Sequence, residues 1–462
     1  MFKPKNWVVL LATVTLGLPL WPGDTLQKEA WQIVTDAMRA GGEDAATALG
    51  MLPTIDDPTS RTLVGTALKG KDGTAIASIS AGLSPAQCRS YLADLGTAAQ
   101  DPGVGPKIPI LDAIARAGTG EAAEILSRIA DGDVGPTAGV AFGLLERMGT
   151  LAEPLFLRTA TNGKTAWARE TALSVLRRMR DTSAVVAFRS ALHDSNEGVR
   201  TAGALGLAQL GHQDGRQQLE TAARDSGSGY QMDALVALAI MGRPGGLDRL
   251  RELVTSPDEA LRGRAVWAIA RSGNMSLKEF SYRLGLDRQP VFRSMLAEKL
   301  LDPNDPKDRS VLQEIITKGD DTSQVVAAQR LLQSGVSASA EAAIARALTS
   351  QSDEVRHLAL KVAAVQPALR PALAEQLASA DPAVQIAAMS AISDLRQRDR
   401  FIAVAPYVAS KVRGVSAAAA RTLALLDPTA AEQVFQEGLT SNSAHVRIHS
   451  AAMLLAVAAR SK

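Results

Sequence analysis

The sequence contains a single cysteine, Cys88, and few aromatic residues, which make up 4% of its 462 residues. One cysteine can form neither an internal disulfide nor a cysteine-based zinc site. Because aromatic residues are so few, the hydrophobic content of 46% consists mostly of Ala, Leu, Val and Ile. Such a composition favours helices that pack closely through small side chains over sheets rich in Val, Tyr and Phe.

The chain also lacks a marked excess of charge of either sign. It has 50 Lys and Arg against 48 Asp and Glu, which gives a net charge of +2 at pH 7. This balance argues against a protein dedicated to binding nucleic acid, although it is compatible with a local basic stripe. The length exceeds what one hydrophobic core usually serves, so we expect either several domains or an array of repeats.

The first 24 residues have the pattern of an export signal. Lys3 and Lys5 precede an uncharged apolar run from Trp7 to Leu20. This run is shorter than the roughly 20 residues that a membrane-spanning helix needs, and it has about the length of a signal-peptide core. We expect a signal peptide at residues 1–24 and a periplasmic or secreted protein. One alternative is a short membrane anchor at residues 7–21, which would be the chain's only contact with the membrane. The other is an ordinary buried helix.

A pattern with a period of about 31 residues runs through most of the chain. In its clearest copy, from Ala191 to Gly211, an apolar helix ends near Leu192, a polar turn follows, and a second helix begins near Val199. Equivalents of the Val199-Arg200 pair are Ala168-Arg169, Tyr230-Gln231, Leu261-Arg262, Phe292-Arg293, Val325, Val355-Arg356, Val384-Gln385, Val415-Ser416 and Val446-Arg447. Self-similarity of this kind indicates a solenoid.

Each period is predicted to form two helices, neither of which can bury its apolar stripe alone. Neighbouring units must therefore stack. Asp, Ser and Asn side chains between the helices are expected to accept hydrogen bonds from the free N–H groups at the start of the second helix. We expect residues 25–105 to form an irregular helical cap with degenerate repeats, because a terminal repeat has one face without a neighbour, and residues 106–462 to form the solenoid.

The segment SALHDSNEGVRTAGALGLAQLG, which ends at Gly211, resembles a short HEAT repeat of the kind also found in phycobilisome lyases. The D-x-N-x-x-V-R start, the small residues Ala202 and Ala204, and the closing Leu-Gly carry the resemblance. Copies such as LVTSPDEALRGRAVWAIARSG and ALTSQSDEVRHLALKVAAV extend it from about Pro106 to the C-terminus. The resemblance implies an all-α fold, a right-handed α-solenoid of stacked two-helix repeats whose second helices line a concave face.

Recurrent arginines near the start of the second helices are the candidate binding residues. These ladder arginines are Arg169, Arg200, Arg262, Arg293, Arg356 and Arg447. A position that repeats along a stack becomes a row of guanidinium groups, which match carboxylates and phosphates. The row therefore either contacts an acidic partner or holds the repeats together. The six-residue spacing from Asp194 to Arg200 favours the structural role, in which each arginine bonds a loop Asp or a carbonyl group.

No catalytic, metal-binding or cofactor-binding residues are predicted. His445 and His449 can share one helical face, but a metal ion would need one or two further ligands. The other histidines, His193, His212 and His357, lie in different repeats. The glycine-rich stretches lack the context and motif of a phosphate loop, no G-x-S-x-G sequence occurs, and Cys88 lies in an ordinary helical pattern.

Two tryptophans, Trp167 and Trp267, fall within second helices, next to Arg169 and near Arg264 respectively. They are interpreted either as fillers of an Ala-rich core or as binding anchors that make cation–π contacts. We expect core filling, because large apolar side chains partition into the interior.

These observations lead to one main hypothesis and two alternatives. The main hypothesis is a non-enzymatic scaffold, exported from the cytoplasm, that binds a protein partner on its concave face; an acidic partner would suit the arginines. The resemblance to phycobilisome lyases suggests instead an enzyme or enzyme subunit that holds a tetrapyrrole in the groove, although an export signal argues against it. Nucleic-acid binding through the arginines is the third hypothesis, which the near-neutral charge disfavours.

Overall fold

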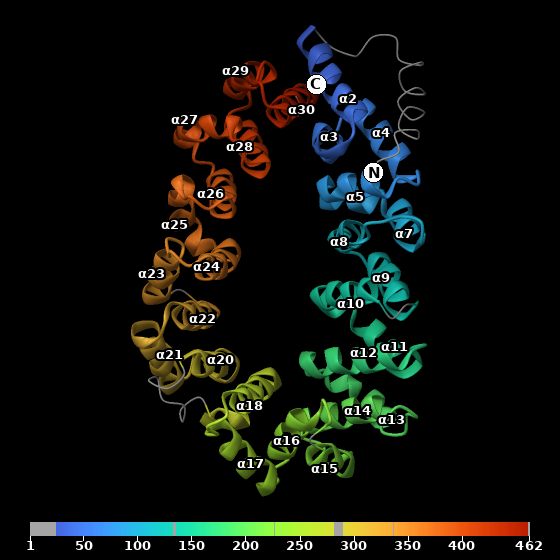
Figure 1. Cartoon of the computed structure of the whole chain (residues 1–462), viewed down its shortest axis with the longest axis vertical. Coiled ribbons are helices and arrows are strands. Elements are labelled where there is room, and N and C mark those ends of the chain that lie inside the picture. Colours follow the sequence, from blue (N-terminus) through green and yellow to red (C-terminus); the bar gives the residue numbers. More distant parts are fainter. Residues whose placement is uncertain (1–24, 133–134, 226, 281–289, 336, 461–462) are drawn as a thin grey trace. The chain divides into compact units, whose positions relative to one another are not determined.

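The computed structural model describes residues 25–132, 135–225, 227–280, 290–335 and 337–460 (Figure 1). These ranges are predominantly helical and contain no strand, which confirms the predicted all-α solenoid. The predicted signal or anchor segment at residues 1–24 lies outside them. None of the described helices is both long and apolar enough to cross a membrane.

The chain divides into two compact units. Unit 1 contains the described residues up to Ala152 together with those from Arg370 onward, and unit 2 is Glu153–Leu369. The boundary predicted near residue 105, between a cap and the solenoid, stays a prediction.

Unit 2 is built from repeats of two helices, as Figure 1 shows. The first helices are α11 (Glu153–Asn162), α13 (Val185–Ala191), α15 (Arg216–Arg224), α17 (Pro244–Val254), α21 (Pro306–Lys318) and α23 (Ala338–Ala347). The second helices are α12 (Ala166–Met179), α14 (Glu197–Gln209), α16 (Gln231–Ile240), α18 (Glu259–Ser272), α20 (Pro290–Leu300), α22 (Asp321–Leu332) and α24 (Asp353–Val365). Short 3₁₀ turns are η2 (Thr182–Ala184), η3 (Met275–Leu277) and η4 (Pro367–Leu369). Each second helix contacts the next one along the chain, so these helices form a continuous layer.

The second-helix layer of unit 2 is concave, because side chains from non-neighbouring repeats meet on it. Gln209 of α14 donates from Nε2 to the carbonyl oxygen of Ser272, the last residue of α18, over 2.8 Å. Arg180, which caps α12, donates to the carbonyl oxygen of Gly273, which caps α18. Repeats that are not adjacent can meet in this way only on the inner side of a curved stack.

Unit 1 has the same pattern in both of its chain segments. Its first helices are α2 (Thr25–Ala40), α4 (Pro58–Leu68), α6 (Pro85–Ser90) with α7 (Leu92–Gln100), α9 (Gly120–Gly132), α25 (Arg370–Ala374) with η5 (Glu375–Ala378), η6 (Arg398–Arg400) with α27 (Phe401–Val404) and η7 (Ala405–Ala409), and α29 (Pro428–Leu439). Its second helices are α3 (Gly42–Ile55), α5 (Gly73–Gly82), α8 (Ile108–Ala117), α10 (Pro136–Arg147), α26 (Pro382–Asp394), α28 (Arg413–Leu426) and α30 (Ala444–Arg460). The turn η1 (Gly149–Leu151) follows α10.

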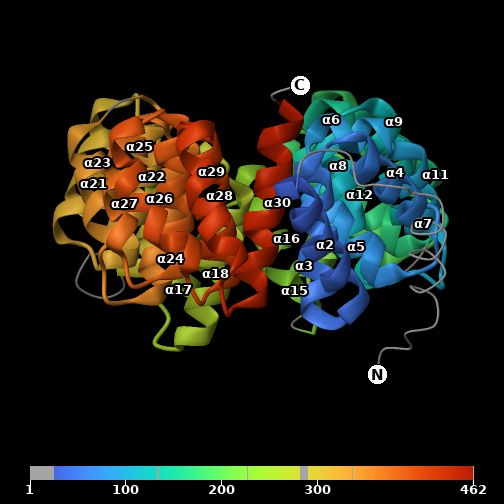
Figure 2. The ribbon, with the colours of Figure 1, turned by 90° about the horizontal axis from the view of Figure 1, so that it is seen from above.

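The last helix of the chain packs against the first two. Helix α30 contacts α2 and α3 as extensively as it contacts α29, and Figure 2 shows α30 beside both. Because α30 also contacts α28, and α3 also contacts α5, α30 takes the place of a second helix that would precede α3. In a linear array, the first and the last repeat would each leave one apolar face without a neighbour. Here these two faces pack against each other.

A charged contact reinforces this packing of the chain ends. The Arg413 guanidinium of α28 donates to Asp44 Oδ1 over 3.0 Å and to Thr47 Oγ1 over 2.8 Å. A carboxylate oxygen of Glu43 lies 3.2 Å from the same side chain. All three partners lie in the first turns of α3, where carboxylates also interact favourably with the helix dipole.

Local sequence explains the helix boundaries. The Asn196 side chain accepts a hydrogen bond from the Val199 N–H over 3.2 Å, and Asp258 caps α18 and Ser352 caps α24 in the same way. Close packing of α14 on α13 depends on glycine: a Cβ added at Gly203 would lie 2.7 Å from the Phe188 carbonyl oxygen. The predicted capping role of the polar turns is therefore confirmed.

Candidate binding surface

The ladder arginines reach back to carbonyl groups in the loop before their own helix. Arg200 Nη1 donates to the carbonyl oxygens of Asp194 and Ser195, both over 2.9 Å. The remaining bonds to the carbonyl six residues earlier are Arg169 to Gly163 (2.9 Å), Arg262 to Ser256 (2.6 Å), Arg356 to Ser350 (2.7 Å) and Arg447 to Ser441 (2.7 Å). The Arg293 side chain lies outside the described part of the structure.

This geometry has a simple electrostatic cause. The last carbonyl groups of a helix and those just after it lack intrahelical donors, and a cation is favourable near a helix C-terminus. The first helix of each repeat therefore presents acceptors where the second helix begins. Gln385, which interrupts the ladder, makes the same six-residue bond from Nε2 to the Ser379 carbonyl oxygen over 2.7 Å.

Asp194 takes part in two arginine contacts. The sequence left open whether each ladder arginine bonds a loop Asp or a carbonyl group, and Arg200 bonds the Asp194 carbonyl oxygen. The Asp194 carboxylate is held by Arg169 of the preceding repeat, through Nε over 2.8 Å and Nη2 over 3.0 Å. The hydrogen bond from Arg169 lowers the pKa of Asp194. At Arg169 the ladder thus links two successive repeats. The contact of the ladder with a partner stays a prediction.

A second cationic group lies on the concave layer of unit 2, and the sequence did not single it out. Arg271, near the end of α18, forms an ion pair with Asp233 Oδ2 of α16. Arg177, near the end of α12, lies 4.0 Å from Asp233 Oδ1. The Asp233 side chain is 9% exposed, and its two carboxylate oxygens are directed to two different guanidinium groups. We call Arg177, Asp233 and Arg271 the arginine–aspartate cluster.

The cluster carries an excess of positive charge. Burial, and then the charge of Arg178, lower the pKa of Arg177 to about 10. Burial, followed by the charges of Arg177 and Arg178, lowers the pKa of Arg271 to about 10 as well. Both groups stay cationic at neutral pH, and their mutual repulsion favours a nearby anion.

Nearby, the Tyr230 hydroxyl donates to the Glu170 carboxylate. Burial and this hydrogen bond raise the pKa of Tyr230. This hydrogen bond joins the start of α16 to α12 beside the cluster.

Trp267 extends the cluster to the protein surface. The Arg271 guanidinium carbon lies 4.1 Å from the centroid of the Trp267 ring, and the tryptophan is 51% exposed. The expectation that Trp267 fills the core is therefore wrong: on α18 the core positions beside it are taken by Val266 and Ala268. The four-residue spacing from Trp267 to Arg271 was a sequence signal for this contact, whereas the sequence had suggested Arg264.

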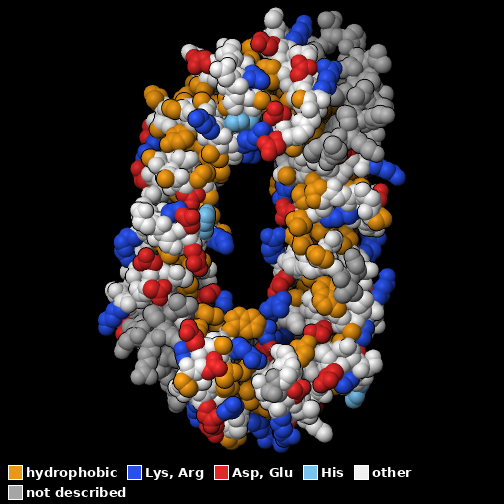
Figure 3. Space-filling model, in the orientation of Figure 1, with side chains coloured by type: hydrophobic (Ala, Val, Ile, Leu, Met, Phe, Trp, Pro, Cys, Tyr) orange, Lys and Arg blue, Asp and Glu red, His pale blue; other side chains and the backbone are white. Residues whose placement is uncertain are grey.

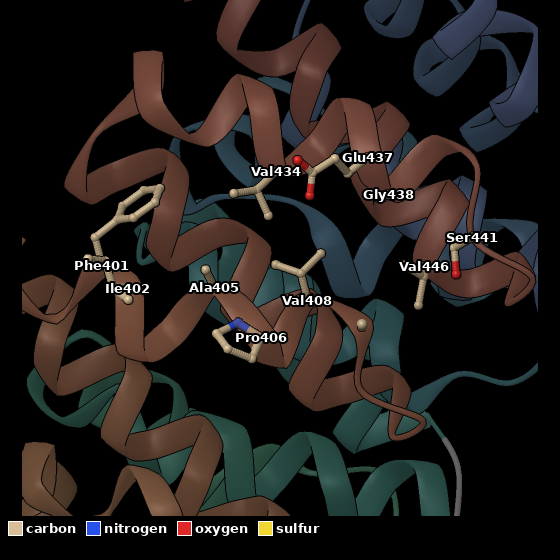
Figure 4. A pocket seen from close by; sticks show the side chains of 11 residues that line it. Phe401, Ile402, Ala405, Pro406, Val408, Val434, Glu437, Gly438, Ser441 and Val446 are labelled. Carbon is tan, nitrogen blue, oxygen red and sulfur yellow. The ribbon is translucent and has the colours of Figure 1, made fainter.

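The apolar groove in Figure 4 has a different character. It has a volume of about 530 Å³ and runs between α27, η7, α29 and the start of α30. Its wall is formed largely by apolar side chains such as Phe401, Ile402 and Val434, with Glu437 as its charged member. This groove therefore does not provide the cationic surface expected for an acidic partner.

The remaining candidates identified in the sequence are structural. His445 and His449 are buried on α30, with ring centroids 5.9 Å apart. Ser416 donates its proton to the Val408 carbonyl oxygen, so His449 Nδ1 donates to Ser416 Oγ over 3.0 Å. Among the described residues no cluster with metal-binding geometry occurs. Cys88 is fully buried, and burial raises the pKa of its thiol, which is typical of an unreactive cysteine.

Acid is expected to destabilise the protein through His449. Burial, and then the charge of His445, lower the pKa of His449 from 6.5 to about 3. The unfolded chain therefore takes up a proton below pH 6.5 that the folded protein refuses until about pH 3. In this window, the free energy of unfolding should fall by up to about 1.4 kcal/mol per pH unit. Urea unfolding at pH 7.5 and pH 5 measures the effect. His449→Gln should flatten the profile and the exposed His193→Gln should not; equal slopes in both variants would contradict this.

Comparison with known proteins identifies the repeats. Residues 154–239, from α11 into α16, match the family described as HEAT repeats. The chain carries HEAT repeats. The matched segment includes the ladder residues Arg169 and Arg200 and the cluster residues Arg177 and Asp233. HEAT repeats commonly mediate protein interactions through extended concave surfaces. The narrower likeness to the repeats of phycobilisome lyases stays a prediction.

Two solved structures similar to this HEAT-repeat chain have low identity to it. An engineered protein is 18% identical, with a TM-score of 0.25, and the match covers 75% of this chain and 98% of that one. Human deoxyhypusine hydroxylase in complex with glycerol is 19% identical, also with a TM-score of 0.25, and the match covers 64% of this chain and 100% of that one. No curated protein matches the chain.

Proposed function

We propose that this HEAT-repeat protein is a non-enzymatic, exported scaffold that binds a protein partner on the concave second-helix layer of unit 2. The observation that carries the proposal is the exposed pair of Trp267 and Arg271. Tryptophan and arginine are the residue types most enriched among residues that dominate binding energy at protein interfaces. A half-exposed indole with a guanidinium on its face leaves apolar area that a partner would cover.

Affinity capture tests the proposed binding. The full-length protein is immobilised, exposed to native cell extract, and compared with Trp267→Ala. We expect the wild-type protein to retain a partner that Trp267→Ala loses, while both proteins unfold at the same urea concentration. Ile402→Ala is the matched control, because Ile402 is 83% exposed but lies in the apolar groove of unit 1. Loss of the same partner by Ile402→Ala alone would place binding in the groove and refute the proposal.

Export is proposed from the amino-terminal sequence, with its basic residues and short apolar run. A reporter enzyme that is active only outside the cytoplasm, fused after Lys462, should be active in cells. The mass of the purified protein distinguishes a cleaved signal from a retained anchor. An inactive reporter together with an intact amino terminus would contradict export while leaving the binding proposal open to its own test.

A further inference from the structure

The arginine–aspartate cluster has more cationic than anionic groups. The cluster, as defined, contains the Asp233 carboxylate, which forms its close ion pair with Arg271. Arg177 lies 4.0 Å from the other carboxylate oxygen, which is beyond hydrogen-bonding distance. A guanidinium has five N–H donors in a planar fork, so one shared carboxylate satisfies only part of the pair.

The two arginines and the neighbouring tryptophan are buried to different degrees, in an order that suits a ligand arriving from solvent. The Arg177 side chain is 14% exposed, the Arg271 side chain 32%, and Trp267 51%. Positive charge therefore extends from the interior to a half-exposed aromatic surface. Charge buried this deeply is strengthened by the low dielectric of its surroundings. An anion that reached Arg271 would lie next to the apolar ring of Trp267.

We propose that the arginine–aspartate cluster binds a carboxylate of an acidic segment in a protein partner, with an apolar neighbour of that carboxylate covering Trp267. This inference rests on the proposed scaffold function and names the chemistry of the partner. The incoming carboxylate pairs with Arg271 and is drawn further by Arg177. Asp233 competes with it for the same donors, which keeps the site compact and closed when no partner is bound.

An acidic protein segment fits better than a nucleic acid. Figure 3 shows Lys and Arg side chains interspersed with Asp and Glu over the face in view. The net charge of the chain is only +2. A nucleic acid needs a continuous cationic track for successive phosphates, whereas a single carboxylate needs one arginine site.

The test is the binding of a fluorescein-labelled peptide in which glutamate alternates with leucine, followed by fluorescence anisotropy. The full-length protein should bind this peptide, and binding should weaken as salt rises. A peptide with glutamine in place of glutamate should bind at least about tenfold more weakly, since a charge-assisted hydrogen bond contributes at least this much.

Variants separate this site from general electrostatics. Arg271→Gln should weaken peptide binding by about tenfold or more, and Arg271→Lys by less, because lysine keeps the charge without the planar fork. Asp233→Asn should strengthen binding several-fold, because it removes the competing carboxylate. The matched control is Arg249→Gln on α17, which changes the same charge at a side chain that is 57% exposed.

Several results would overturn the inference. These are equal binding of the glutamine peptide, equal weakening by Arg271→Gln and Arg249→Gln, or weaker binding by a folded Asp233→Asn protein. The scaffold proposal fails separately, if native extract yields no partner while the peptide binds as expected. If a captured partner is lost by Trp267→Ala but kept by Arg271→Gln at all salt concentrations, the scaffold stands and the carboxylate site does not.

Discussion

Replacing Arg200, Arg262 and Arg356 together with alanine is expected to lower the free energy of unfolding by about 3 to 6 kcal/mol, since a hydrogen bond from a charged donor contributes about 1 to 2 kcal/mol at a partly buried site. Each of these side chains donates to a loop carbonyl six residues earlier. The three sites lie in different repeats, so their losses should add. Urea unfolding followed by circular dichroism measures the change.

The protein contains its own control for this prediction. Gln385 makes the equivalent bond to the Ser379 carbonyl oxygen, so a triple Arg→Gln variant should retain much of the stability that the alanine variant loses. If the alanine variant unfolded at the wild-type urea concentration, the bonds would contribute nothing to stability. If it also failed to capture the partner, the ladder arginines would belong to the binding surface.

Replacing Asp233 with alanine is expected to cost about 3 to 5 kcal/mol, the usual penalty for leaving a buried charge without its partner. Asp233 is 7% exposed and is ion-paired to Arg271, with Arg177 4.0 Å away. Without its carboxylate, the two guanidinium groups lose the anion that they share. The urea midpoint of the variant measures this loss.

Two comparisons make this result specific. Asp248→Ala on α17 removes a carboxylate that is 64% exposed and ion-paired to Arg251, and it should cost less than about 1 kcal/mol. Adding Arg271→Gln to Asp233→Ala should restore part of the lost stability, because it removes one of the unpaired cations. Equal effects of Asp233→Ala and Asp248→Ala would contradict a buried role for Asp233.

Sequence reasoning predicted the ladder better than the binding surface. The Val199-Arg200 register identified positions whose first member is buried, including Val199, Val355 and Val446. The arginine beside each of them bonds within its own repeat, over a six-residue separation that the sequence displays directly. The sequence left open whether these arginines bond a loop Asp or a carbonyl group, because that choice depends on where the first helix ends in space.

The arginine–aspartate cluster could not be predicted from sequence spacing in this way. Arg177, Asp233 and Arg271 come from three different repeats and are brought together by the curvature of unit 2. The exposure of Trp267 likewise depends on which side of α18 its neighbours cover. The contact of α30 with α2 and α3 joins segments separated by nearly the whole chain, and Arg413 bonds residues that lie 366 to 369 positions away.

The sequence by itself determined the helices, their caps, the period of about 31 residues and the bonds within each repeat. These features depend on neighbours a few residues apart, so composition and spacing specify them. Tertiary structure alone decided which charges meet on the concave layer and what covers the ends of the array. Those outcomes depend on the small rotation between successive repeats, which accumulates over the stack and which no single repeat encodes.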